Sequence, residues 1–130
     1  MEKFPKEVKL VYKNFPLPNQ RFAVKAAQCA LAANEQGKFW EFHEKLFQVE
    51  KGLNNEKING IAGGLALDME KFAKDMNSPA IRDILSRDFN DGRRIGLRGI
   101  PTILINGKIA ERRGLADLQA IVEEEIKASF

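Results

Sequence analysis

The chain has 130 residues, a length typical of one domain that can bury a hydrophobic core. Hydrophobic residues make up 44% of it and charged residues 30%, a balance that argues against a disordered or low-complexity chain. The net charge of +3 is small and the two signs are mixed along the sequence, so we expect no nucleic-acid partner. The apolar runs are far shorter than the about 20 residues of a membrane-spanning helix, so we expect no membrane partner.

The first regular element is predicted in residues 7–18, which read EVKLVYKNFPLP. Val8, Val11 and their neighbours favour β-structure, and Pro16 and Pro18 end the run. We therefore expect a buried strand that leaves a sheet at these prolines.

Residues 21–95 have the apolar spacing of helices and predict a helical insertion. Its first helix, residues 21–34, is rich in alanine and contains Cys29, the single cysteine of the chain. We interpret Cys29 as a small buried residue, because a thiol on such a helix usually serves as an apolar side chain. The alternative is a reactive lone thiol. A single cysteine excludes an internal disulfide and a Cys-x-x-Cys pair within these residues.

Further helices of this insertion are indicated by apolar stripes and capping residues. The next helix is expected to place one apolar face inward, formed by Phe39, Phe42, His43, Leu46 and Phe47. Asp68 and Ser78 are the predicted N-caps of two later helices, and Pro79 suits the first turn of the second one. The side chains expected to face the core in these two helices are Phe72, Met76, Ile81, Ile84, Leu85 and Phe89.

His43 is the single histidine of the chain, and no second metal ligand stands at a suitable spacing from it. One imidazole and one thiol are too few for the four ligands of a structural zinc site. We therefore expect no metal and no cofactor, and we interpret His43 as a core residue rather than a catalyst.

Residues 98–130 predict a loop, a β-hairpin and a closing helix. Residues 102–105 are rich in β-formers, Asn106-Gly107 is a strong hairpin signal, and residues 108–112 can return antiparallel. The closing helix is expected to place five residues on one face: Leu115, Leu118, Ile121, Val122 and Ile126. The predicted order is strand, helical insertion, hairpin and helix, which is an α/β arrangement.

This order, with GIPT just before the hairpin, resembles the DsbA-like branch of the thioredoxin superfamily. The resemblance rests on VKLVYKNFPL, KAAQCA, QGKFWEFHEKLF, LDMEKF, DGRRIGLRGIPTILINGK and LQAIVEEEI, which follow one another in the family's order. It covers nearly the whole chain and implies one thioredoxin-like domain over residues 1–130, into which the helical residues 21–95 are inserted. Members of this family are protein-disulfide oxidoreductases, and the implied partner is an extended or unfolded polypeptide.

The resemblance also implies a substrate-binding site at Gly99, Ile100, Pro101 and Thr102. Pro101 would be the family's cis-proline, and the N–H and C=O of Ile100 would face the substrate. A cis X-Pro bond lies only about 0.5–1 kcal/mol above the trans form, so tertiary packing can hold it in a tight turn. The backbone edge can then pair with a peptide as an added strand. A purely structural turn proline is the alternative.

The chain departs from the family at its start. Members begin with a strand and a Cys-x-x-Cys at the head of a helix, whereas MEKFPKEV resembles only the end of that helix. We therefore expect an N-terminally truncated domain that lacks the central first strand and any catalytic residue. Because thiol–disulfide exchange needs an attacking thiolate and a second thiol, we expect these residues alone to be redox-inactive.

Absence of the central strand would leave backbone groups without partners, at about 1–3 kcal/mol for each buried group. Three outcomes stay open: residues upstream complete the sheet, the early strand pairs directly with the hairpin, or two chains share strands. For the isolated chain we expect a homodimer.

Three functions stay open. The chain belongs to a DsbA-family oxidoreductase whose dithiol lies upstream, or it is a redox-dead module that binds peptides or a partner protein, or it is a glutathione-dependent transferase or isomerase of the kappa-like branch. In-frame upstream codons for a Cys-x-x-Cys would identify the first. The family resemblance implies a periplasmic or exported protein, whereas a chain complete as given would be cytoplasmic, because its start has no secretory signal.

Overall fold

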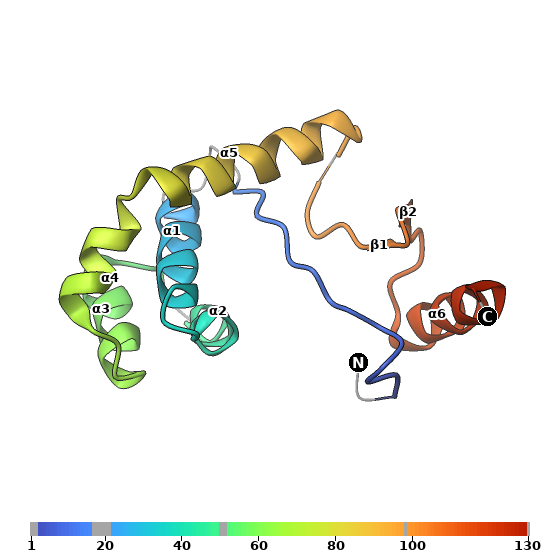
Figure 1. Cartoon of the computed structure of the whole chain (residues 1–130), viewed down its shortest axis with the longest axis horizontal. Helices are drawn as coiled ribbons and strands as arrows, with labels where there is room; N and C mark the ends of the chain where they lie inside the picture. Colours follow the sequence, from blue (N-terminus) through green and yellow to red (C-terminus); the bar gives the residue numbers. More distant parts are fainter. Residues whose placement is uncertain (1–2, 17–21, 50–51, 98, 130) are drawn as a thin grey trace. The chain divides into compact units, whose positions relative to one another are not determined.

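The computed structural model describes residues 3–16, 22–49, 52–97 and 99–129 (Figure 1). The elements follow in the order α1 (Ala23–Asn34), α2 (Phe39–Phe47), α3 (Asn55–Gly64), α4 (Met69–Met76), α5 (Pro79–Arg94), β1 (Leu104–Ile105), β2 (Lys108–Ile109) and α6 (Leu115–Ser129). The chain divides into two compact units. We call Lys13–Ile95 the helical unit, and Met1–Tyr12 with Gly96–Phe130 the hairpin unit. The helical insertion was predicted to begin at residue 21, and the segment of loop, hairpin and closing helix at residue 98. Both positions lie outside the described residues.

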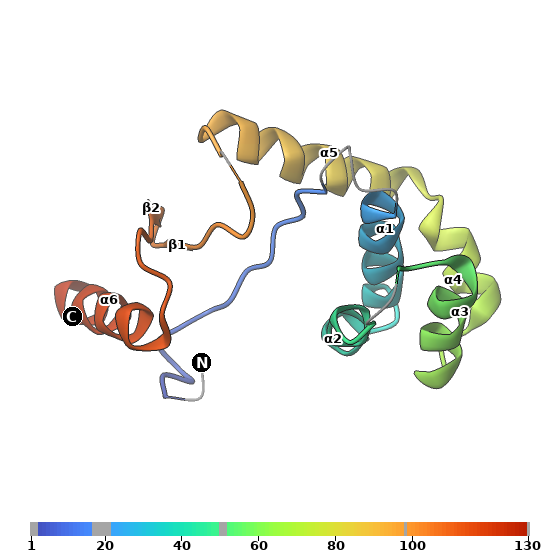
Figure 2. The same cartoon turned by 180° about the vertical axis from the view of Figure 1, so that it is seen from behind.

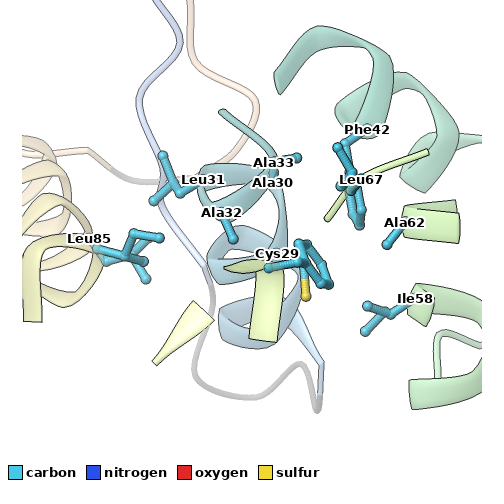
Figure 3. Packing of buried hydrophobic residues seen from close by; sticks show 12 residues of the cluster. Cys29, Ala30, Leu31, Ala32, Ala33, Phe42, Ile58, Ala62, Leu67 and Leu85 are labelled. Carbon is cyan, nitrogen blue, oxygen red and sulfur yellow. The ribbon is translucent and has the colours of Figure 1, made fainter. Parts of the chain in front are cut away.

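Helix α1 is the centre of the helical unit and packs against α2, α3, α4 and α5. Its alanines allow the close approach of neighbouring helices, and five consecutive residues from Cys29 to Ala33 are buried. In Figure 3, Leu31 lies on the side of α1 that faces Leu85, whereas Cys29 lies towards Ile58 of α3. The prediction that Cys29 is a buried member of an alanine-rich helix is confirmed.

Side-chain caps fix where the helices of this unit begin. The Asp68 carboxylate accepts a hydrogen bond from the N–H of Lys71 at 3.1 Å, and the Ser78 hydroxyl accepts one from the N–H of Ile81 at 3.3 Å. Both caps were predicted from sequence, and Pro79 stands in the first turn as expected. A third cap, at Asn54, was not predicted.

The aromatic stripe predicted on α2 is only partly correct. Phe42 is fully buried, and its ring lies 5.7 Å from that of Phe72. Phe47 is 75% exposed instead of facing the core. It is the last residue of α2, and its ring lies 4.8 Å from the His43 ring at the surface of the unit.

The hairpin unit contains the predicted β-hairpin. Leu104 pairs with Ile109 and Ile105 with Lys108, so β1 and β2 are antiparallel. Asn106 and Gly107 both have positive φ, 49° and 81°, the backbone of a type I′ turn. The hairpin is therefore confirmed, although each strand has two residues and is shorter than predicted.

Helix α6 lies beside the hairpin within this unit (Figure 2). The Lys108 ammonium is 3.0 Å from the Glu125 carboxylate of α6, and Lys3 makes a 2.7 Å ion pair with Glu123. Exposed pairs of this kind contribute little to stability. Ala110 is the single buried residue among its described positions. Leu115, one of the five residues predicted on a single face of this helix, is exposed.

The early strand predicted in residues 7–18 is wrong for the part of it that the structure describes. Residues 8–16 form no strand, and Leu10, Val11 and Tyr12 are exposed. The described residues form one sheet, and it contains β1 and β2 alone. Direct pairing of the early segment with the hairpin is therefore also wrong. The physical reason is that a strand needs a partner for its backbone groups, and the described residues of the hairpin unit provide none for this segment.

Candidate functional site

The segment that precedes β1, residues 99–102, forms one wall of an open pocket in the hairpin unit. We call this segment the Pro101 loop. The peptide bond between Ile100 and Pro101 is cis. The pocket has a volume of about 520 Å³ and is lined by Gly96, Leu97, Gly99, Ile100, Pro101, Thr102, Ile109, Ala110, Glu111 and Arg113. All four residues predicted to bind substrate therefore lie together on one surface.

Side chains hold two carbonyls of the Pro101 loop. The Thr102 hydroxyl donates a hydrogen bond to the Gly99 carbonyl at 2.7 Å. The Arg113 guanidinium donates one to the Pro101 carbonyl at 2.5 Å. The next carbonyl in this alternating series, that of Ile103, accepts a bond from the N–H of Ala110 at 2.8 Å. The Thr102 bond thus closes the loop on itself, the Arg113 bond attaches it to the segment after β2, and the Ile103 bond attaches the residue that follows the loop to the hairpin.

Ile100 is a residue of the loop whose backbone and side chain are both available to a ligand. Its side chain is 48% exposed at the pocket. Among the described residues, neither its N–H nor its C=O has a hydrogen-bond partner. An unpaired main-chain donor and acceptor beside an apolar surface is the arrangement that can receive an extended peptide as an added strand.

Sequence reasoning missed Arg113 as part of this site. It lies twelve positions after Pro101, beyond the hairpin, and the contact between them depends on how the chain folds back. No local spacing of residue types indicates such a contact. The sequence gives only a basic Arg112-Arg113 pair, which is usually a solvated surface.

The family model described as Thioredoxin matches residues 5–124. The chain belongs to the thioredoxin family. The match includes the Pro101 loop, the hairpin and most of α6, and in the helical unit it includes α1 to α5.

Two curated relatives of this thioredoxin-family chain are proteins of different kinds. The Na(+)/H(+) antiporter NhaA of Herminiimonas arsenicoxydans is 31% identical over 105 residues, which are 81% of this chain and 17% of the antiporter. The probable disulfide bond formation protein D of Bacillus anthracis is 26% identical over 129 residues, which are 93% of this chain and 59% of that protein. The chain thus spans less than two thirds of either relative.

Two solved structures share the fold. A thioredoxin-like oxidoreductase from Silicibacter pomeroyi DSS-3 matches with a TM-score of 0.81 and 27% identity, over 91% of this chain and 68% of that one. The thiol-disulfide exchange protein alpha-DsbA2 from Wolbachia pipientis matches with a TM-score of 0.78 and 22% identity, over 88% and 64%. The predicted α/β, DsbA-like thioredoxin fold with helical segments is therefore confirmed.

Cys29 is the single cysteine of this thioredoxin-family chain. It belongs to the core of the helical unit and does not line the pocket. Its side chain is fully buried in the helical unit, with Sγ 3.7 Å from the Sδ of Met76. Burial raises the pKa of the Cys29 thiol to about 12, against an opposing effect of the Lys25 charge. Since the thiolate is the nucleophile, this environment suits a structural cysteine.

Cys29 is expected to resist alkylation while the protein is folded. At pH 8 a thiol whose pKa is about 12 is ionised in only about one molecule in ten thousand, and its burial also blocks the reagent. Mass spectrometry after iodoacetamide treatment should find unmodified protein, whereas the same treatment in urea should modify Cys29. Rapid modification of the native chain would instead support the lone reactive thiol.

The described residues offer few other centres for chemistry. His43 lies among aromatic rings, 5.5 Å from that of Phe39 and 5.7 Å from that of Trp40. Burial lowers the pKa of His43 below its ordinary value, which favours the neutral imidazole at pH 7. In the described ranges no group of three or more His, Cys, Asp or Glu residues could hold a metal ion. A helix both long and apolar enough to cross a membrane is likewise absent from this part of the chain.

Proposed function

We propose that this chain binds an extended polypeptide at the Pro101 loop and that its 130 residues do not themselves exchange disulfides. The observation that carries the proposal is the unpaired backbone of Ile100 at the edge of an open pocket. Membership of the thioredoxin family and similarity to the probable disulfide bond formation protein D of Bacillus anthracis support the peptide-binding part of the proposal.

The chemistry of the pocket suits a peptide backbone. Ile100 offers one N–H and one C=O, and Pro101 has no N–H that would compete for the peptide's carbonyls. Leu97, Ile100 and Ile109 supply apolar surface for side chains of the peptide. Main-chain hydrogen bonds would give the affinity, and this apolar surface would favour β-branched or aromatic residues.

Disulfide exchange requires two thiols in reach of each other, one to attack and one to resolve the mixed disulfide. The chain has one cysteine, and it is buried. In an assay that follows reduction of insulin by dithiothreitol, we therefore expect no acceleration over the reductant alone. A clear acceleration would contradict the redox-inactive part of the proposal and leave the binding part intact.

Peptide binding is tested by titrating a fluorescent, cysteine-free peptide of alternating valine and serine and following its anisotropy. Ile100→Ala should weaken binding by about tenfold, because the variant loses three carbon atoms whose exposed half would be covered by the peptide. Ile95→Ala is the matched control, since Ile95 is 47% exposed but does not line the pocket. Equal affinities for both variants, or no binding by the unmodified chain, would contradict the proposed site.

The homodimer also stays a proposal for the isolated chain. Leu104 and Ile109 are exposed on the hairpin and could meet a second copy. A monomeric mass by sedimentation equilibrium at micromolar concentration would contradict it.

A further inference from the structure

We propose that Arg113 is a positioning residue for the Pro101 loop, which it holds in the shape that presents the Ile100 backbone to a peptide. This inference rests on the proposed peptide-binding function. Arg113 also lines the pocket, but it lies outside the Pro101 loop.

The first reason is the pattern of hydrogen bonds along the loop. The carbonyls of Gly99 and Pro101 are both held by side chains, those of Thr102 and Arg113. The carbonyl between them, that of Ile100, has no partner among the described residues. The two hydrogen bonds thus restrain the backbone on either side of Ile100 and leave its own N–H and C=O unpaired within the described part of the chain.

The second reason is the kind of contact that Arg113 makes. Pro101 has no N–H, so its carbonyl is the single main-chain group through which this residue can be held by a hydrogen bond. The donor is a charged guanidinium, and hydrogen bonds from charged donors are stronger than those between neutral groups. In the described chain, the Arg113 guanidinium has no carboxylate within ion-pair distance that would draw it away from this carbonyl.

The third reason is where Arg113 stands in the hairpin unit. It follows β2 and precedes α6, so its contact connects the Pro101 loop to the segment that joins the hairpin to the last helix. Few side chains in this unit are buried, and packing alone holds the loop weakly. A loop in such a unit needs specific polar attachments to keep one shape.

The test compares Arg113→Ala, Arg113→Lys and Arg112→Ala in the same peptide titration. Arg113→Ala should weaken binding of the valine-serine peptide by about tenfold, since a hydrogen bond from a charged donor contributes on that order. Arg113→Lys should recover part of the affinity, because an ammonium can also donate to the carbonyl. Arg112→Ala removes the same charge from the neighbouring position, which does not line the pocket, and should stay within about twofold of the unmodified chain.

A second measurement separates failure of this inference from failure of the proposed function. The carbonyl ¹³C chemical shift of Pro101 reports its hydrogen bond directly and requires no peptide. A change of this shift in Arg113→Ala, but not in Arg112→Ala, supports the attachment even if the unmodified chain binds no peptide, in which case only the proposed function fails. If the unmodified chain binds and Arg113→Ala binds equally well with an unchanged shift, the positioning role is overturned and the proposed function stands.

Discussion

Replacing Phe42 by alanine is expected to lower the free energy of unfolding of the helical unit by about 3–5 kcal/mol. Phe42 is fully buried and lies against Phe72 in the core around α1. Removing the ring takes away its burial and leaves a cavity that close-packed helices fill only in part. Urea unfolding followed by fluorescence of Trp40, the single tryptophan, measures the loss in this unit.

The same helix provides a matched control. Phe47→Ala removes an identical side chain from α2, but Phe47 is 75% exposed. Its loss should be below about 1 kcal/mol, including its ring contact with His43. Alanine improves helix propensity at both positions, so the difference between the variants isolates burial. Similar losses for the two variants would mean that Phe42 is not a core residue in solution.

Residues of the helical unit were largely predictable because their signals are local. Asp68 and Ser78 bond to backbone groups three positions away, and those bonds are visible in the sequence as caps. Asn106-Gly107 likewise determines its turn through the φ angles that these two residues accept. Such features depend on neighbours in the chain, so sequence spacing describes them well.

The absence of the early strand and the exposure of Leu115 were not predictable in this way. A β-forming run becomes a strand only if a partner strand meets it, and for Val11 the described residues provide none. The apolar stripe of α6 becomes a core only if another element covers it, and in the hairpin unit Leu115 stays exposed. Both outcomes depend on partners distant in sequence, which local patterns do not specify.

The candidate site also contains one part that the sequence predicts and one part that depends on residues distant in sequence. The positions of Ile100 and Pro101 in a loop before the hairpin follow from the family motif. The contact of Arg113 with Pro101 does not, because it depends on the return of the chain after β2.

Asp88, which lies outside the candidate site, is intermediate between a locally predictable residue and an unpredictable one. It lies seven positions after Ile81 and three after Leu85 on the buried side of α5, so a charged residue in an apolar stripe was a visible signal of a buried polar contact.

Asp88 is buried at the point where the chain enters the helical unit. Its Oδ2 accepts hydrogen bonds from both the backbone N–H and the side-chain Nδ2 of Asn14, each at 2.9 Å. Asn14 is also buried, and the adjacent Phe15 ring stacks on that of Phe89 at 4.7 Å. The carboxylate therefore holds an irregular segment on α5 that has no sheet to hold it.

Replacing Asp88 by alanine is expected to destabilise the helical unit by about 1–3 kcal/mol for each of the two buried Asn14 donors that lose their acceptor. Asp88→Asn keeps an oxygen that can accept from both donors, so it should cost clearly less. The Lys13 ammonium lies 3.7 Å from the Asp88 carboxylate and 3.3 Å from that of Asp91. Asp91→Ala removes the second of these pairs and should cost at most about 1 kcal/mol, because that pair is exposed. Urea unfolding ranks the three variants.

Amide hydrogen exchange at Asn14 provides the decisive measurement, because it reports the buried donor itself. In Asp88→Ala the Asn14 N–H should exchange much faster, whereas amides of α1 should change only as far as global stability falls. A loss in Asp88→Ala no greater than that in Asp91→Ala, with Asn14 exchange unchanged, would mean that charge attraction to Lys13 holds this segment. Because buried donors without an acceptor are costlier than a lost surface ion pair, we expect the hydrogen bonds to dominate.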